Sequence, residues 1–128
     1  VDGGVFANNP AMCALTEMIS LWEGEAEALM VSLGTGQQNR PIPYDKARKW
    51  GLRGWALPLF DVMMDGVSDT VDYQLSQLLD PSRYFRFQTE LTIADDDMDD
   101  VSSLNIQHLK RQAEKLIARE HARLEELA

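Results

Sequence analysis

The sequence predicts an α/β fold with a mainly parallel sheet, and three features near its start indicate this class. Val1 is interpreted as the end of a strand, and Gly3 and Gly4 permit the positive φ angles of a sharp turn. Apolar residues at helical spacing come next, followed by a short apolar run that ends at Gly34-Thr35-Gly36. Strand, helix and buried strand form one βαβ unit, whose crossover we expect to be right-handed.

The first helix is predicted over residues 10–22. Asn9 is a good N-cap and Pro10 a good first helical residue, and Gly24 is expected to close the helix. Its apolar positions are Met12, Leu15, Ile19 and Trp22. Residues 28–33 then form the predicted buried strand, because the run is short, contains a β-branched residue and is followed by glycines.

Two helices are predicted in the middle of the chain. Residues 44–50 form a short helix with a cationic face, and Gly51, Gly54 and Pro58 are expected to interrupt the chain after it. A long helical pattern then starts at Leu59. It continues through Met63, Val67, Val71, Leu75 and Leu78, and ends at Asp80-Pro81, because the residue before proline disfavours the helical region.

The last third of the sequence predicts a strand, an acidic loop and a helix. Residues 84–88 alternate, with Phe85 and Phe87 on one face and Arg86 on the other. Residues 95–100 form the acidic loop, and Ser102 or Ser103 is expected to cap the last helix. The apolar stripe of this helix is Ile106, Leu109, Ala113, Leu116, Ile117, Leu124 and Leu127.

Composition restricts the possible partners and locations. The 128 residues carry a net charge of −9, which argues against nucleic-acid binding and weakens the case for a basic patch that docks on anionic lipid. The lone Cys13, interpreted as a small buried residue, permits no internal disulfide and fits a reducing compartment, so we expect a cytoplasmic protein. No uncharged apolar run reaches the roughly 18–20 residues that a membrane span needs.

Asp2 is the residue most suggestive of chemistry. A strand that ends in Asp-Gly-Gly leaves a carboxylate at the carboxyl edge of a parallel sheet, where open α/β folds build their sites. The alternative is structural, because Asp-Gly is a common turn dipeptide and aspartate often binds local backbone N–H groups. The chain also begins with a turn and not with methionine, so we expect residues 1–128 to be the C-terminal part of a single domain.

Several segments together resemble the patatin-like phospholipases. Val1-Asp2-Gly3-Gly4-Val5-Phe6-Ala7-Asn8-Asn9-Pro10-Ala11 is similar to the segment around that family's catalytic aspartate, and Val31-Ser32-Leu33-Gly34-Thr35-Gly36 to its next strand and loop. Further segments resemble the bacterial branch: Arg40-Pro41-Ile42, Lys49-Trp50-Gly51, Met63-Met64-Asp65-Gly66, Ser68-Asp69-Thr70-Val71-Asp72-Tyr73 and Tyr84-Phe85-Arg86-Phe87-Gln88. The resemblance is colinear and implies a three-layer patatin-like fold.

The resemblance implies a lipid acyl hydrolase with a serine–aspartate dyad. The serine of a Gly-x-Ser-x-Gly elbow attacks an ester of a phospholipid or related lipid, and the aspartate is its general base. Asp2 carries over as catalytic, and Gly3 and Gly4 as its turn, with no metal or cofactor. Asn8 is expected to support this turn by a hydrogen bond within it. No serine of this chain lies in such an elbow, so the serine is expected upstream and the chain alone is expected to be inactive.

Other readings remain open beside this one. The competing function is a catalytically inactive fragment or interaction module of the same fold. The expected partners are a lipid ester and a transient membrane surface, which makes the protein peripheral at the membrane. Self-association through an exposed sheet edge is also expected. The aromatic and methionine-rich residues 50–64 are interpreted mostly as core or ordinary helix face, with an acyl-chain groove or membrane contact as the alternative.

Three further motifs are given structural interpretations. Gly34-Thr35-Gly36 lacks the rest of a phosphate-binding fingerprint and is interpreted as a strand-exit turn. Residues 95–100 lack the central glycine and closing glutamate of a calcium loop, so we expect a solvated loop. His108 and His121 are too far apart on a helix to share a metal.

Overall fold

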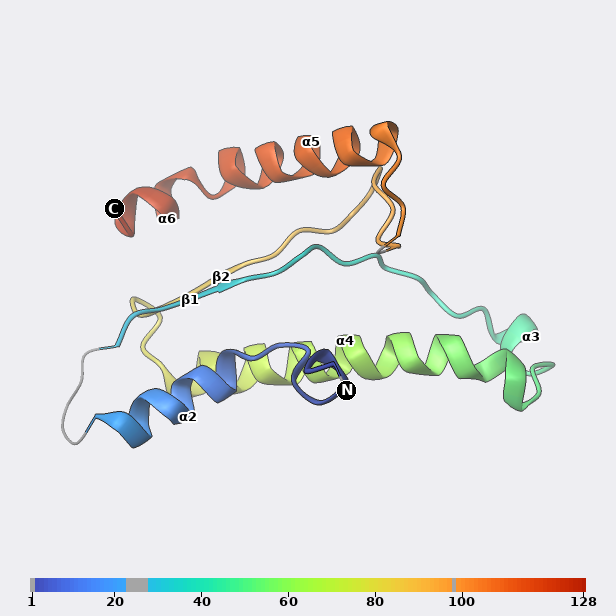
Figure 1. The fold of residues 1–128 in the computed structure, drawn as a ribbon, viewed down its shortest axis with the longest axis horizontal. Coiled ribbons are helices and arrows are strands. Elements are labelled where there is room, and N and C mark those ends of the chain that lie inside the picture. The colour runs from blue at the N-terminus through green and yellow to red at the C-terminus, as the bar shows by residue number, and fades with distance from the viewer. Residues whose placement is uncertain (1, 23–27, 98) are drawn as a thin grey trace. The chain divides into compact units, whose positions relative to one another are not determined.

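The computed structural model describes residues 2–22, 28–97 and 99–128 (Figure 1). Val1 and Gly24, on which the first strand and the end of the first helix were predicted, lie outside the described residues. In chain order, the elements are helix α1 (Gly4–Ala7), helix α2 (Ala11–Leu21), strand β1 (Met30–Leu33), helix α3 (Tyr44–Ala47), helix α4 (Leu52–Leu78), strand β2 (Tyr84–Phe87), helix α5 (Ser103–Arg119) and helix α6 (His121–Glu126).

Strands β1 and β2 form a two-stranded parallel sheet. The Met30 N–H donates to the Arg83 carbonyl, and the Gly34 N–H donates to the Phe87 carbonyl, so both chains advance in the same direction. The predicted α/β class with a parallel sheet is therefore confirmed. The chain divides into two compact units, residues 1–30 with 41–84 and residues 31–40 with 85–128.

The first unit is built on the packing of α2 against α4. Leu15, Leu75 and Tyr84 form its buried cluster, and Leu75 is fully inaccessible to solvent. The Tyr84 hydroxyl donates to the Asp72 carboxylate at 2.6 Å, which satisfies the one polar group of this cluster. The apolar spacing predicted for the first helix and for the second half of α4 is what brings these residues together.

Helix α4 begins at Leu52, seven residues before the predicted start at Leu59. The prediction that Gly54 and Pro58 interrupt the chain is wrong, because both lie inside the helix. A proline ring crowds the carbonyl four residues earlier, and that residue is Gly54, whose lack of a side chain lets the backbone adjust. Among the described residues, no helix has both the length and the apolarity to cross a membrane.

In the second unit, the buried surface of the sheet is aromatic and that of α5 is polar. Phe85 and Phe87 are buried, and the Arg123 guanidinium lies over both rings at 5.6 and 5.2 Å. The buried residues of α5 are Asn105 and Gln112. The predicted apolar stripe is only partly covered, with Ile106 and Ile117 exposed, and the predicted single helix is divided at Glu120.

The Gly34-Thr35-Gly36 segment leaves β1 as a tightly packed turn. Gly36 has a φ of +94°, and its N–H donates to the Gln88 side chain at 2.9 Å. A Cβ on Gly34 would lie 2.5 Å from Gln88, and one on Gly36 would lie 2.6 Å from Leu91. Neighbouring side chains thus fill the space that a phosphate would need, which supports the strand-exit interpretation.

Candidate active site

The Asp2 carboxylate is held at the start of α1 and stays exposed to solvent. Its Oδ1 accepts a hydrogen bond from the Gly4 N–H at 2.7 Å, and its carbonyl accepts one from the Val5 N–H at 3.2 Å. Both bonds lie within the turn that opens α1, so they fix the backbone and one carboxylate oxygen. The carboxylate is therefore orientated and remains able to accept a proton from a group brought to it.

Gly4 supports this turn because its lack of a side chain leaves room for the Asp2 carboxylate, and not because it has a positive φ. Gly3 has a φ of −61°, and among the described residues only Gly36 has a positive φ. The sequence-based reason given for Gly3 and Gly4 is therefore wrong. A Cβ on Gly4 would lie 3.0 Å from Asp2 Oδ1 and 3.7 Å from Asn8 Oδ1, whereas a Cβ on Gly3 would meet nothing within 4 Å. Gly4 leaves room for the carboxylate, and Gly3 has no such role.

Asn9, and not Asn8, supplies the side-chain hydrogen bonds that anchor this segment. Asn8 is exposed and forms no side-chain hydrogen bond among the described residues, so its predicted stabilising bond is not found. Asn9 is buried, accepts the Ala11 N–H at 3.2 Å and donates to the Ser68 carbonyl of α4 at 3.3 Å. Asn9 was predicted to be the N-cap of a helix that starts at Pro10, whereas α2 starts at Ala11 and Pro10 is at its N-cap position.

The bond from Asn9 to Ser68 explains how the turn is fixed to the rest of the first unit. The two residues are 59 positions apart in the chain. Sequence reasoning identified Asn9 only as a helix cap, and no local signal points to a carbonyl so distant in the chain. The anchor lies seven residues after Asp2, directly after α1, so it limits how far the Asp2 turn can move.

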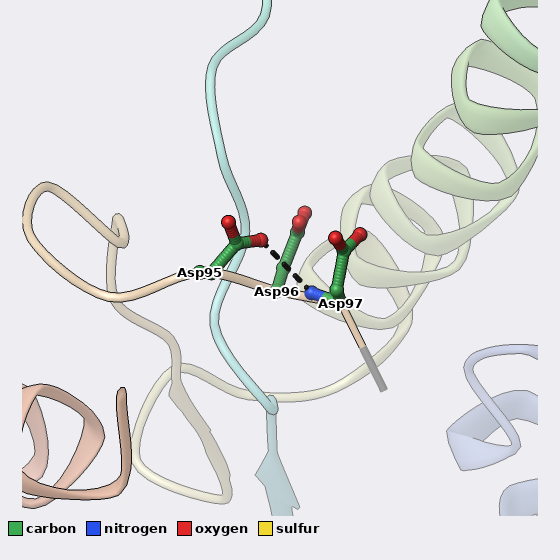
Figure 2. Close-up of side chains that lie close together, drawn as sticks. All are labelled: Asp95, Asp96 and Asp97. Atoms are coloured by element: carbon green, nitrogen blue, oxygen red, sulfur yellow. Dashed lines mark hydrogen bonds between the residues drawn. The ribbon is translucent and has the colours of Figure 1, made fainter. Parts of the chain in front are cut away.

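Three consecutive carboxylates form a second cluster, Asp95, Asp96 and Asp97, on an exposed loop (Figure 2). Their oxygens lie within 4.8 Å of one another, a spacing that could hold a cation. The Arg40 guanidinium already bonds to Asp96 and lies 3.9 Å from Asp95, and Asp95 Oδ1 accepts the Asp97 N–H. An arginine therefore balances part of the charge, and the cluster fits the predicted solvated loop.

Asn105 and Ser102 tie this loop to the start of α5. The Asn105 amide donates to the carbonyls of Asp95 and Asp100, and its oxygen accepts the Asp95 N–H. Ser102 accepts the Asn105 N–H at 3.2 Å, which confirms Ser102 as the N-cap of α5. The Ser102 N–H and hydroxyl bind the Asp100 carboxylate and lower its pKa. An open hollow of about 430 Å³ lies beside this loop. It is lined partly by Asp95, Asp100, Ser102 and Asn105, whose polar groups already form these hydrogen bonds.

Exposure separates two interpretations of apolar residues. Residues 50–64 were expected to be mostly core or ordinary helix face, and Leu57, Phe60 and Met63 are helix-face residues of α4 that are 77%, 51% and 61% exposed. Cys13 was expected to be buried and is exposed. His108 and His121 lie on different helices, and His121 lies 3.4 Å from Glu125 in a surface pair.

Known proteins that are similar to this chain belong to the family that the sequence resembles. Patatin-like protein 4 of Arabidopsis thaliana is 31% identical over 91% of this chain and 36% of its own length. Patatin-like protein 6 of the same plant is 35% identical over 69% of the chain and 20% of its own length. Patatin-like protein 2 of Oryza sativa subsp. japonica is 28% identical over 98% of the chain and 37% of its own length.

These relatives support the assignment of the chain to the patatin-like family. They are plant proteins, so the bacterial type stays a prediction. The chain spans about a third or less of the length of the patatin-like proteins that it matches. No family model matches the chain, and no solved structure matches it.

Proposed function

We propose that the protein to which this chain belongs is a lipid acyl hydrolase of the patatin-like type. The chain is the C-terminal part of a single domain, and Asp2 is the general base of a serine–aspartate dyad whose serine lies upstream. The substrates are carboxylic esters of phospholipids or related lipids. The protein works in the cytoplasm and meets these lipids peripherally at a membrane surface.

The exposed carboxylate of Asp2 is the observation that carries the proposal. A dyad base must be accessible to the serine and restrained in orientation, because general-base catalysis requires hydrogen-bond geometry. The Gly4 N–H holds Oδ1, Gly4 leaves space beside it, and Asn9 anchors the segment to α4. An aspartate that only capped a turn would share the first two features, but it would not need the anchor to α4.

The proposed chemistry proceeds through an acyl-enzyme. The serine Oγ attacks the ester carbonyl carbon while its proton passes to the Asp2 carboxylate, and the carbonyl oxygen becomes an oxyanion. Collapse of this intermediate breaks the ester bond, and the departing alkoxide takes the proton back from Asp2. Water then attacks the acyl-enzyme with Asp2 again as base, which releases the fatty acid and the free serine.

The test replaces the carboxylate of Asp2 in the full-length protein. Asp2→Asn keeps an oxygen that can accept the Gly4 N–H but cannot take a proton, so kcat on a soluble p-nitrophenyl ester should fall about 10²–10⁴-fold. Asp61→Asn is the matched control, because Asp61 is another exposed aspartate of the first unit, and its kcat should match that of the parent. The isolated chain should give no turnover.

The same assay distinguishes the alternative of an inactive interaction module. A full-length protein that folds but hydrolyses no ester supports the module. Turnover that is equal in Asp2→Asn and the parent would rule out Asp2 as the base. Turnover by residues 1–128 alone would refute the proposal that the serine of the dyad lies upstream of this chain.

A further inference from the structure

The charge of the chain is reversed locally around the start of α4. Residues 44–57 carry Lys46, Arg48, Lys49 and Arg53 against the single anion Asp45, a net charge of +3 in a chain whose net charge is −9. We name these four cations the basic surface. Residues 58–78, the rest of α4, carry no cation and four anions, which are Asp61, Asp65, Asp69 and Asp72. The segment that runs from α3 into the first turn of α4 is therefore cationic, and the remainder of α4 is acidic.

The basic surface is exposed and largely unpaired within the protein. All four cations are exposed, and Arg48 approaches Asp45 only at 4.0 Å. Among the residues that the structure describes, Lys46, Lys49 and Arg53 form no ion pair. Arg53 also lies in the first turn of α4, where a cation opposes the helix dipole. Among the described residues, this cluster of like charges is balanced only by Asp45, which lies 4.0 Å from Arg48.

Large apolar side chains are exposed among and on either side of these cations in the sequence. Leu52 is 92% exposed, and Tyr44 and Leu57 are each 77% exposed. Trp50 and Trp55 pack edge to face, with ring centroids 5.2 Å apart and planes at 80°. A Cβ on Gly54 would lie 3.0 Å from the Trp50 Cβ, so the glycine leaves room for Trp50 to pack against the first turn of α4.

We propose that residues 44–57 dock the protein on the surface of an anionic lipid bilayer. Tryptophan and tyrosine favour the interface between water and hydrocarbon, exposed leucines add buried apolar area, and unpaired lysines and arginines are attracted to anionic headgroups. A protein partner that covered this segment would have to desolvate three unpaired cations, whereas at a bilayer they stay hydrated among the headgroups. The acidic remainder of α4 is repelled by the same bilayer, which directs contact to residues 44–57.

This inference deepens the proposed function, since it names the membrane surface that a lipid hydrolase would use, but its test does not depend on hydrolysis. Binding of the full-length protein is measured by flotation with phosphatidylcholine vesicles that contain either no or 30% (about one lipid in three) phosphatidylglycerol. The protein should bind the anionic vesicles preferentially, and high salt should weaken the binding because it screens surface charge.

The charge-reversal variant K46E/K49E/R53E tests the basic surface. Each basic residue near an anionic surface strengthens partition about fivefold, so loss of the three cations alone predicts a decrease on the order of 100-fold, and repulsion of the three added carboxylates makes the decrease larger. The matched control is K110E/R111E/K115E, which makes the same change in net charge on α5, at residues that are likewise exposed. This control should bind like the parent to within about threefold, because only charges near the lipid act strongly.

Equal loss in both charge variants would overturn the proposal, as would equal binding to neutral and anionic vesicles or no binding at all. A second measurement does not need the charge variants to fold. The chain has three tryptophans, Trp22, Trp50 and Trp55. Brominated anionic lipid should quench the parent's fluorescence, and quenching that persists in W50F/W55F would place the contact elsewhere.

Hydrolysis assays keep this inference separate from the proposed function. K46E/K49E/R53E should retain kcat on a soluble ester and lose activity on anionic vesicles. Anionic vesicle binding through residues 44–57 without hydrolysis of any ester would refute the enzyme and support the docking surface. Hydrolysis of vesicle lipid that is unchanged by the triple variant would refute the docking surface and support the enzyme.

Discussion

Addition of one methyl group at Gly4 should reduce activity without reducing stability. In Gly4→Ala, the new Cβ would lie 3.0 Å from Asp2 Oδ1, closer than carbon and oxygen normally approach, and 3.7 Å from Asn8 Oδ1. Gly4 has no positive φ, so alanine is compatible with the backbone. The carboxylate must therefore shift by a few tenths of an ångström, and its 2.7 Å bond to the Gly4 N–H must lengthen.

The expected size of the effect follows from this displacement. A misplacement of about 1 Å in a catalytic group can cost about 10²-fold in rate, so a shift of a few tenths of an ångström predicts a fall in kcat of about 3–10-fold. Glycine in a helix is less stable than alanine by about 0.5–1 kcal/mol. The free energy of unfolding of Gly4→Ala should therefore be equal to or above that of the parent.

Gly3→Ala is the matched control. A Cβ at Gly3 meets nothing within 4 Å and its φ is −61°, so kcat should be unchanged. The measurements are kcat and KM on a soluble p-nitrophenyl ester and the urea midpoint of each full-length variant. Full kcat in Gly4→Ala, or an equal loss in both variants, would refute the spatial role assigned to Gly4.

Two further predictions concern stability. Leu75→Ala should lower the free energy of unfolding by about 2–5 kcal/mol in urea titration, because Leu75 is fully buried, whereas Leu78→Ala, at a position 66% exposed, should change it by less than about 0.5 kcal/mol. Hydrogen bonds from Arg119 and Arg123 hold the pKa of Glu120 below its ordinary value of 4.5. A carboxylate with a lowered folded-state pKa stabilises the protein above the unfolded value, and this contribution is lost as the pH falls through the folded value. Glu120→Gln should therefore lower Tm by about 2–4 °C at pH 7, as loss of a surface ion pair does. This difference in Tm should vanish in acid. A difference that persists unchanged below pH 3 (roughly one unit or more under the ordinary pKa) would contradict the stabilising role of the Glu120 carboxylate.

The parts of the fold that were predicted correctly depend on local signals. Helix α2 follows from apolar spacing and from the Asn9-Pro10 start, and it was misplaced by one residue at each end. Strand β1 follows from a short apolar run, strand β2 from the alternation of apolar and polar residues, and the N-cap at Ser102 from side-chain chemistry. Each of these features is determined by residues within a few positions of one another, which is why the sequence alone identifies them.

The features that were missed depend on contacts between distant residues. The start of α4 was misjudged because Gly54 and Pro58, each a helix breaker alone, compensate each other at a spacing of four residues. The anchor of the Asp2 turn was assigned to Asn8, because no local signal connects Asn9 with Ser68. The interpretation of Asp2 as a catalytic base depends on a resemblance across most of the chain, since the Asp-Gly pair alone is ordinary.

The polar buried face of α5, which apolar periodicity could not predict, determines where the sheet can grow. Carbonyls of Phe87 and Thr89 in and after β2 accept N–H groups from the β1 side. The intervening carbonyls of Arg86, Gln88 and Glu90 accept side-chain donors of α5 and α6: Arg123 at 3.4 Å, Arg119 at 2.9 Å and Gln112 at 2.8 Å. The outer edge of β2 is therefore closed to another strand.

Strand β1 has no such cover among the described residues, where it pairs with β2 alone. Its apolar residues Val31 and Leu33 are 45% and 74% exposed. A further strand, whether from another part of the protein or from a second copy of the chain, can therefore be added at β1 and not at β2. The self-association expected from the sequence would use the β1 edge. Extension of the sheet within one protein would use the same edge, so the two compete. A chain whose β1 edge is already paired should remain monomeric.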